Sequence, residues 1–202
     1  MAHNQMIERA ARDWVKEGLI AVLLFFLIRE WLLPLVHLSP VTEIYWLRPI
    51  LIAIGAYLLL DYSRCPQFPA WLLKLAVSLF IIVRYFYPQQ WPGVTGWELY
   101  LNVCLRDLFL LSQGELWAVS PENRTLLFLL GWAMLIYALY TLIVFRQTVL
   151  WFLGATIGYL VLFQIATGID TAAALLRTGG LGLALLAILR SPWLERRFRL
   201  SA

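Results

Sequence analysis

Six long apolar runs, separated by short polar breaks, constrain this chain more than any other feature of its sequence. Each run has the length of about 17–25 residues that an α-helix needs to cross the hydrocarbon core of a bilayer. The breaks contain proline, glycine and polar residues, as in SRCPQFP and YPQQWPGVTGWE. We therefore expect an all-α polytopic membrane protein with six transmembrane helices, at residues 15–38, 46–62, 70–87, 125–145, 149–166 and 171–189.

The composition supports a membrane protein and argues against a nucleic-acid-binding one. Of the 202 residues, 62% are hydrophobic and 14% are charged, whereas about a quarter of the residues in a soluble domain are charged. The net charge of +4 comes from basic residues that mostly flank the apolar runs. Such residues indicate membrane topology, so we expect no nucleic acid partner.

The distribution of lysine and arginine predicts a cell-membrane protein with both termini in the cytoplasm. Residues 1–14 form the predicted cytoplasmic N-terminal segment, residues 15–190 the six-span domain, and residues 191–202 a basic cytoplasmic tail. The first run is long and no small-residue cleavage site follows it, so we interpret it as a span and not as a cleaved signal peptide. The predicted inner basic residues are Arg9, Arg12, Lys16, Arg64, Arg146, Arg190, Arg196, Arg197 and Arg199.

The connection between the third and fourth runs is too apolar for a plain loop. Glu98, Asn102 and Arg106 recur every fourth residue beside a stripe of apolar side chains, which is helix periodicity. We expect an amphipathic interfacial helix over residues 97–118 on the outer surface. A re-entrant helix is the alternative. Ser120 and Pro121 then predict the start of the next helix, as cap and first helical residue.

Charged residues lie within or beside the outer halves of three predicted spans. At 1.5 Å per residue, Glu30 lies about 10 Å and Arg177 about 8 Å from the outer ends of their helices. Because an unpaired charge inside a membrane is costly, we expect Glu30 to pair with Arg177 or Arg84. Arginines that extend to the headgroups, or a substrate or ion path, are the alternatives. The candidate polar network is Arg29, Glu30, Arg84, Asp170 and Arg177.

Small residues in the last two spans predict close helix packing. Gly154 and Gly158 form a GxxxG pattern, and Gly179, Gly180 and Gly182 lie in the sequence GGLGLA. Such residues allow helix backbones to approach closely in lipid. We expect them to pack within one molecule, with a dimer face as the alternative.

No catalytic constellation is recognisable in the sequence, so we expect that this chain is not an enzyme. The histidines are His3 and His37, and neither is placed to activate Cys65 or Cys104, which we interpret as packing residues. Signatures of serine hydrolases, zinc proteases, phosphate-binding loops and dinucleotide sites are missing. We therefore predict no catalytic residue, no cofactor and no metal ligand.

A family resemblance covers residues 15–190. The stretch Glu122–Leu186, which opens with ENRTLLF and contains the inner turn FRQ, the outer turn ID and the segment ALLRT, carries most of it together with REWLLPL at Arg29–Leu35. This combination resembles the N-terminal membrane region of bacterial membrane-bound transglutaminase-like proteins. The resemblance implies that a Cys-His-Asp catalytic domain outside the cytoplasm follows this region after a further span. None of that catalytic motif is present here.

These observations lead us to expect a non-catalytic membrane domain. Its partners would be the lipid bilayer and an extracytoplasmic transglutaminase-like domain, with the outer polar layer and the interfacial helix as the docking floor. One alternative is a small six-span substrate-binding subunit of an importer, in which Glu30, Arg84 and Arg177 line a pocket. A self-associating structural protein is another alternative, and the sequence leaves the oligomeric state open.

Overall fold

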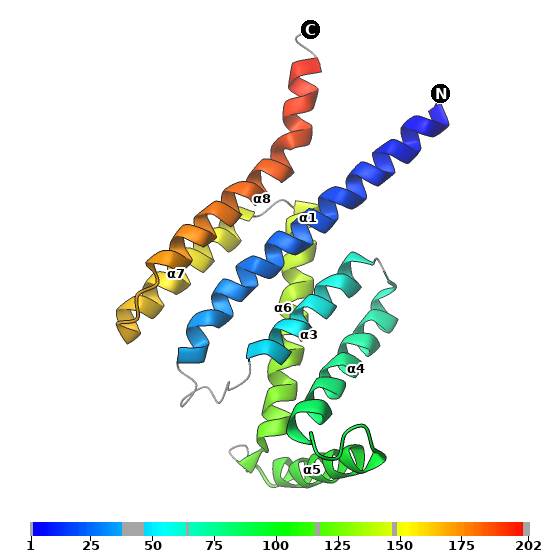
Figure 1. Ribbon diagram of the computed structural model, residues 1–202, viewed down its shortest axis with the longest axis vertical. Coiled ribbons are helices and arrows are strands. Elements are labelled where there is room, and N and C mark those ends of the chain that lie inside the picture. The colour runs from blue at the N-terminus through cyan, green and yellow to red at the C-terminus, as the bar shows by residue number, and fades with distance from the viewer. Residues whose placement is uncertain (1, 38–46, 64, 116–117, 147–148, 200–202) are drawn as a thin grey trace. The chain divides into compact units, whose positions relative to one another are not determined.

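A computed structural model describes residues 2–37, 47–63, 65–115, 118–146 and 149–199, and its regular structure over these residues is helical (Figure 1). The predicted all-α class is therefore confirmed. The helices are α1 (Ala2–His37), α3 (Leu47–Tyr62), α4 (Gln67–Phe86), α5 (Val94–Ser112), α6 (Pro121–Arg146), α7 (Val149–Thr167) and α8 (Ala172–Arg199).

Several of these helices have the length and hydropathy of membrane spans. Within the described ranges, four segments are long and apolar enough to cross a bilayer: Gln67–Phe86, Pro121–Ile143, Val149–Thr167 and Ala172–Arg190. They lie in α4, α6, α7 and α8 and indicate a multi-pass membrane protein. The helix α3 has 16 residues, which is short for a span. Six spans were expected, and four segments of the described residues meet these criteria.

The helix boundaries differ from the predicted ones mainly in the first and the last helix. The helix α1 begins at Ala2, so the predicted N-terminal segment 1–14 is largely helical, because Ala, Glu, Arg and Met favour helix and no proline or glycine precedes Gly18. The helix α8 continues to Arg199 through most of the predicted tail and includes Pro192. The Leu, Glu and Arg residues that follow Pro192 favour helix.

The amphipathic helix ends earlier than predicted, at Ser112 and not at residue 118. Gly114 has a φ of 83°, the left-handed conformation that glycine adopts easily after a helix. The N–H of Gly114 donates to the carbonyl of Leu111, and the N–H of Glu115 to that of Leu110. This Schellman motif satisfies carbonyls at the end of α5.

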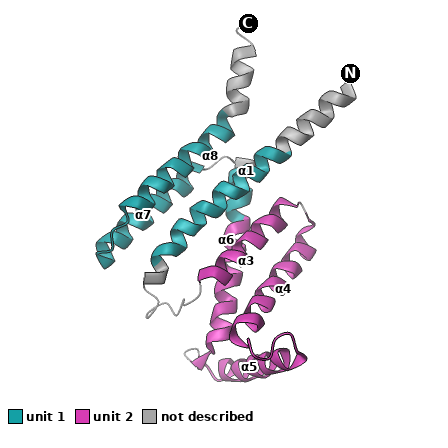
Figure 2. Ribbon diagram, in the orientation of Figure 1, with its two compact units in different colours: residues 1–44, 138–202 teal, residues 45–137 magenta. Residues whose placement is uncertain are grey.

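The chain divides into two compact units, residues 1–44 with 138–202 and residues 45–137 (Figure 2). In the first unit, α7 and α8 pack as a hairpin and α1 contacts both helices. Leu24, Leu27, Ile28 and Leu32 of α1 are buried, and their spacing places them on one stripe of the helix.

In the second unit, α3 and α4 form a second hairpin and α5 contacts α4. Ile82 and Val83 of α4 form a buried cluster with Tyr100 of α5. Gly96 of α5 is buried, and a Cβ atom at this position would lie 3.3 Å from Cγ1 of Val83. The missing side chain at Gly96 therefore allows α5 to lie close to α4.

The glycines of α7 and α8 differ in their surroundings. A Cβ atom on Gly182 would overlap with Cδ1 of Leu153, so the two helices approach closely there. At the other four glycines that were expected to pack, a Cβ atom would meet no described atom within 4 Å: Gly154, Gly158, Gly179 and Gly180. Within the described residues, close packing in this hairpin therefore depends on Gly182 and not on the GxxxG pattern.

Candidate functional site

An ion pair in the first unit joins α1 and α8. Nε of Arg177 donates to Oε1 of Glu30 at 3.1 Å, and Nη2 of Arg177 donates to Oε2 of Glu30 at 2.9 Å. This is the bidentate geometry that a planar guanidinium offers to a carboxylate. The Glu30 side chain is 2% exposed, whereas that of Arg177 is 51% exposed. The structure thus brings together two charges that are 147 residues apart in the sequence.

The other members of the predicted network lie in different environments. Nη1 of Arg29 is 3.9 Å from Oε1 of Glu30, and its side chain is 40% exposed. Asp170 is exposed, and its Oδ1 accepts a hydrogen bond from the N–H of Ala172 at the start of α8. Arg84 lies in the second unit, where it is exposed. The charged cluster of the first unit therefore consists of Arg29, Glu30 and Arg177.

Aromatic side chains hold α1 against α7 next to this charged cluster. The Trp31 ring stacks on Tyr159 with centroids 4.6 Å apart. Nε1 of Trp31 donates to Oγ1 of Thr156 at 2.9 Å, and the Tyr159 hydroxyl donates to the carbonyl of Trp31 at 3.1 Å. These contacts fix the α1 backbone beside Glu30.

The second unit contains an ion pair that the sequence analysis missed. Nζ of Lys74 in α4 donates to both carboxylate oxygens of Asp61 in α3, at 2.7 and 2.9 Å. The side chains are 1% and 5% exposed, respectively. Nζ also lies 5.0 Å from the ring centroid of Trp71 and 5.5 Å from that of Tyr137, within the range of a cation–π contact.

A signal for this pair is present in the sequence. Asp61 stands at the end of the second apolar run and Lys74 near the start of the third, so both lie at the same end of a predicted hairpin. Charges at one depth on neighbouring spans are expected to pair. A hydrogen bond of 2.6 Å between Tyr57 and Ser78 joins the same two helices nearer their middle.

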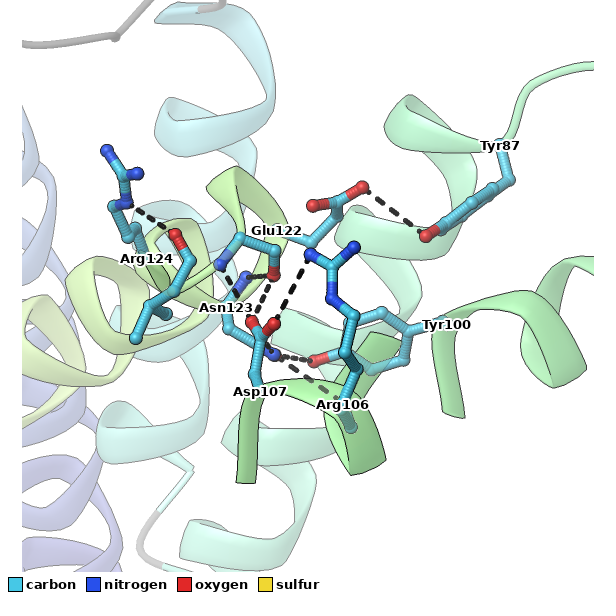
Figure 3. A network of polar contacts seen from close by, with 10 residues as sticks. Tyr87, Tyr100, Arg106, Asp107, Glu122, Asn123 and Arg124 are labelled. Carbon is cyan, nitrogen blue, oxygen red and sulfur yellow. Dashed lines mark hydrogen bonds and ion pairs between the residues drawn. The ribbon is translucent and has the colours of Figure 1, made fainter. Parts of the chain in front are cut away.

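A polar network connects α5 to the start of α6 (Figure 3). Oδ2 of Asp107 accepts hydrogen bonds from the N–H of Ser120 at 2.8 Å, from the Ser120 hydroxyl, and from Nδ2 of Asn123 at 2.8 Å. The Ser120 hydroxyl oxygen accepts from the N–H of Asn123 at 3.4 Å. Ser120 therefore caps α6 and Pro121 is its first residue, as predicted.

The network continues from Asn123 to α5. Oδ1 of Asn123 accepts hydrogen bonds from the Tyr100 hydroxyl at 3.1 Å and from the Cys104 thiol at 3.4 Å. Oδ1 of Asp107 is buried and receives no hydrogen bond from the described residues, although Nη2 of Arg106 lies 3.5 Å away. In the Asp107 carboxylate, Oδ2 thus accepts several hydrogen bonds from α6 and its cap, whereas Oδ1 lies near the Arg106 guanidinium group.

The electrostatics of this network favour an ionised Asp107. Burial alone would raise the pKa of Asp107, but hydrogen bonds from Ser120 and Asn123 and the charge of Arg106 outweigh it, so the pKa lies below its usual value. Burial and the Glu122 carboxylate raise the pKa of Tyr87 to about 12. The Tyr87 phenol therefore stays neutral and donates to Oε1 of Glu122 at 3.3 Å.

The surface of α5 has three sides. Gly96, Tyr100 and Asp107 form its buried side. A second, apolar side is exposed and includes Val94, Leu101, Leu105 and Leu108, and Leu99, Phe109 and Leu111 are exposed elsewhere on the helix. A third, polar side is also exposed, and it contains Glu98, Asn102 and Arg106. The helix thus combines a face for the protein, an apolar flank and a polar flank.

Comparison with known proteins gives a long relative without a described function. The chain is 27% identical over 179 residues to the uncharacterized protein YebA of Bacillus subtilis (strain 168). The match covers 86% of this chain and 23% of YebA, so the chain spans about a quarter of the length of that relative. No family model matches the sequence. No solved structure matches it either.

Proposed function

We propose that this chain is a non-catalytic membrane domain that anchors and positions an extracytoplasmic transglutaminase-like domain. The observation that carries the proposal is the coverage of the match to YebA, which is 86% of this chain but 23% of the relative. A similar region therefore occurs inside a much longer protein. The resemblance of Glu122–Leu186 and Arg29–Leu35 to membrane-bound transglutaminase-like proteins suggests what the remaining part contains.

The proposed topology has six spans in a cell membrane, with both termini in the cytoplasm. To the four apolar segments of α4, α6, α7 and α8 it adds α1 and α3. The α1 helix contains the apolar run from Val22 to His37, and α3 packs against α4 as the other half of a hairpin. The excess of arginine at the predicted inner ends supports this orientation.

In the second unit, the helices that contribute to this proposed docking floor are α5 and the start of α6. The apolar flank of α5 suits the boundary between headgroups and acyl chains, and its polar flank suits water or a protein surface. The Asp107 network ties α5 to α6, so the floor is held by hydrogen bonds as well as by apolar packing. A rigid surface positions a partner better than a mobile one does.

The DNA downstream of codon 202 tests the anchoring role most directly. A continuing or neighbouring reading frame that encodes an apolar span and then a Cys-His-Asp domain is expected. A stop codon followed by importer genes would instead favour a substrate-binding subunit. Saturable binding of a small polar molecule to the purified chain would then be the deciding measurement.

Site-specific photo-crosslinking tests the docking floor in the protein that carries both parts. A photoreactive residue in place of Asn102, on the polar flank of α5, is expected to crosslink to the catalytic domain. The matched control replaces Leu105, on the apolar flank, and is expected to crosslink to lipid. A catalytic domain that crosslinks from neither position would show that α5 is not the docking surface.

A further inference from the structure

The charged cluster of the first unit carries more positive than negative charge. Arg29 and Arg177 surround the single carboxylate of Glu30, so two positive charges and one negative charge leave a net charge of +1. The cluster lies on α1 and on the apolar segment Ala172–Arg190 of α8. A net charge at this place in a membrane helix is unfavourable unless another group neutralises it.

Counting contacts with the described residues, both guanidinium groups keep hydrogen-bond donors that are not used. Arg177 uses Nε and Nη2 on Glu30, whereas a guanidinium has five N–H donors in all. Nε of Arg177 and Nη1 of Arg29 lie 3.1 and 3.9 Å from the same oxygen, Oε1 of Glu30. The two guanidinium groups therefore lie beside one carboxylate, and their side chains are 51% and 40% exposed.

The position of Arg177 is fixed by its partner. An arginine near a membrane surface normally extends its side chain to the headgroups. Arg177 cannot do so without breaking both hydrogen bonds to Glu30, which would leave a buried carboxylate without them. The stack of Trp31 on Tyr159 holds the α1 backbone at the same level. An anionic ligand of Arg177 would therefore bind where Glu30 holds the guanidinium group.

A phosphate group fits these donors. The planar fork of a guanidinium binds phosphate oxygens in pairs, and two guanidinium groups close together bind phosphate better than one. Arg177 stands five residues after Ala172, about 8 Å along the helix, so a lipid headgroup needs only a short displacement to reach it. In a membrane, the phosphate groups that a span meets are those of lipid headgroups.

We propose that Arg29 and Arg177 bind the phosphate group of an anionic phospholipid, with Glu30 as a positioning residue that orients Arg177. The proposal requires that this part of the chain lies in a membrane. It does not require that a transglutaminase-like domain follows.

Native mass spectrometry of the purified full chain, with added phosphatidylglycerol or phosphatidylcholine, measures this binding. We expect tighter binding of phosphatidylglycerol. Arg29→Gln leaves the Glu30–Arg177 hydrogen bonds in place and is expected to weaken phosphatidylglycerol binding about tenfold, the effect of losing one charge-assisted contact. Arg29→Lys keeps the charge and is expected to retain most of the binding. Arg84→Gln, an exposed arginine of the second unit, is the matched control.

Three results would overturn the proposal. One is equal binding of the two lipids by the unaltered chain. Another is a loss of phosphatidylglycerol binding in Arg84→Gln as large as that in Arg29→Gln. The third comes from added inorganic phosphate: displacement of the lipid at millimolar concentration would identify the ligand as a free anion. The thermal unfolding temperature of each variant, measured in parallel, shows whether Arg29→Gln remains folded.

Discussion

Each compact unit holds an ion pair with a buried carboxylate, but the two pairs differ in range and exposure. Lys74 and Asp61 are 13 residues apart, belong to one hairpin, and are both almost fully buried. Glu30 and Arg177 are 147 residues apart, and Arg177 is half exposed. The first pair is closed and electrically balanced, so it serves the structure of a hairpin. The second pair is open and has an excess arginine, so it can meet a ligand.

The largest effect is expected from breaking the closed pair. Lys74→Met leaves the Asp61 carboxylate buried without its partner, and removal of one member of a buried pair costs about 3–5 kcal/mol. Thermal unfolding of the detergent-solubilised chain, followed by circular dichroism, measures the loss. The double variant Lys74→Met with Asp61→Leu removes both charges and should regain most of the stability. An unchanged unfolding temperature in Lys74→Met would show that the pair is not formed.

A smaller effect is expected in the open pair. Arg177→Gln removes the two charge-assisted hydrogen bonds to Glu30, and such bonds contribute about 1.5–3 kcal/mol. Arg29 remains near the carboxylate and moderates the loss. Exchange of the charges in the double variant Glu30→Arg with Arg177→Glu should recover part of the stability that either reversal alone removes. If unfolding measurements find no recovery, the two side chains do not act as a pair.

The Asp107 network of the second unit should have a smaller and pH-dependent effect. Asp107→Asn removes the charge but keeps one acceptor oxygen, so it is expected to destabilise the chain by about 0.5–1.5 kcal/mol at pH 7, the range for one hydrogen bond. Because the pKa of Asp107 is lowered in the folded chain, its stabilising contribution is complete above the unfolded value of about 3.9. The contribution is lost as the pH falls from there through the lowered pKa.

Unfolding of the wild type and of Asp107→Asn between pH 7 and pH 2 measures this dependence. The difference between the two proteins should shrink at the acidic end. Glu98→Gln changes an exposed carboxylate on the same helix and should follow the wild type throughout. A difference that stays constant with pH would show that the charge of Asp107 does not contribute.

The smallest effect concerns the α7–α8 hairpin of the first unit. Glycine-to-alanine exchange in a helix gains up to about 1 kcal/mol, and Gly180→Ala should gain it because its Cβ meets no described atom within 4 Å. Gly182→Ala places a Cβ on the flexible end of the Leu153 side chain, which then has to shift, so this shift offsets part of the gain. Gly182→Ala should therefore be the less stable variant in thermal unfolding. Equal stability would mean that Leu153 moves aside without loss.

Much of the helical architecture could be predicted from the sequence. Apolar run length located α3, α4, α6 and α7 within a few residues of their observed ends, and Ser120 and Pro121 marked the start of α6. The early end of α5 depends on Gly114. Its positive φ allows the N–H groups of Gly114 and Glu115 to bond to the last carbonyls of the helix. The helices α1 and α8 are longer than their apolar runs, because a helix continues through polar residues of good helix propensity.

The candidate sites were less predictable. The sequence predicts Arg177 or Arg84 as the partner of Glu30, since equal depth in a membrane does not determine which helices are neighbours. The pairing of Lys74 is not predicted, because an apolar run with a single lysine still has the composition of a membrane span. Asp107 was missed because it lies outside the repeat of Glu98, Asn102 and Arg106, on the side of α5 that faces α6.

The sequence by itself determined the class of the molecule, because long apolar helices satisfy their own backbone groups in a membrane without water. It also determined the start of α6, since the Ser120 cap and Pro121 act over a few residues. Only the tertiary structure decided which charges meet and which glycine is crowded. Pairs such as Glu30–Arg177 and Leu153–Gly182 depend on which helix faces align, and helix faces are aligned by packing across the whole unit.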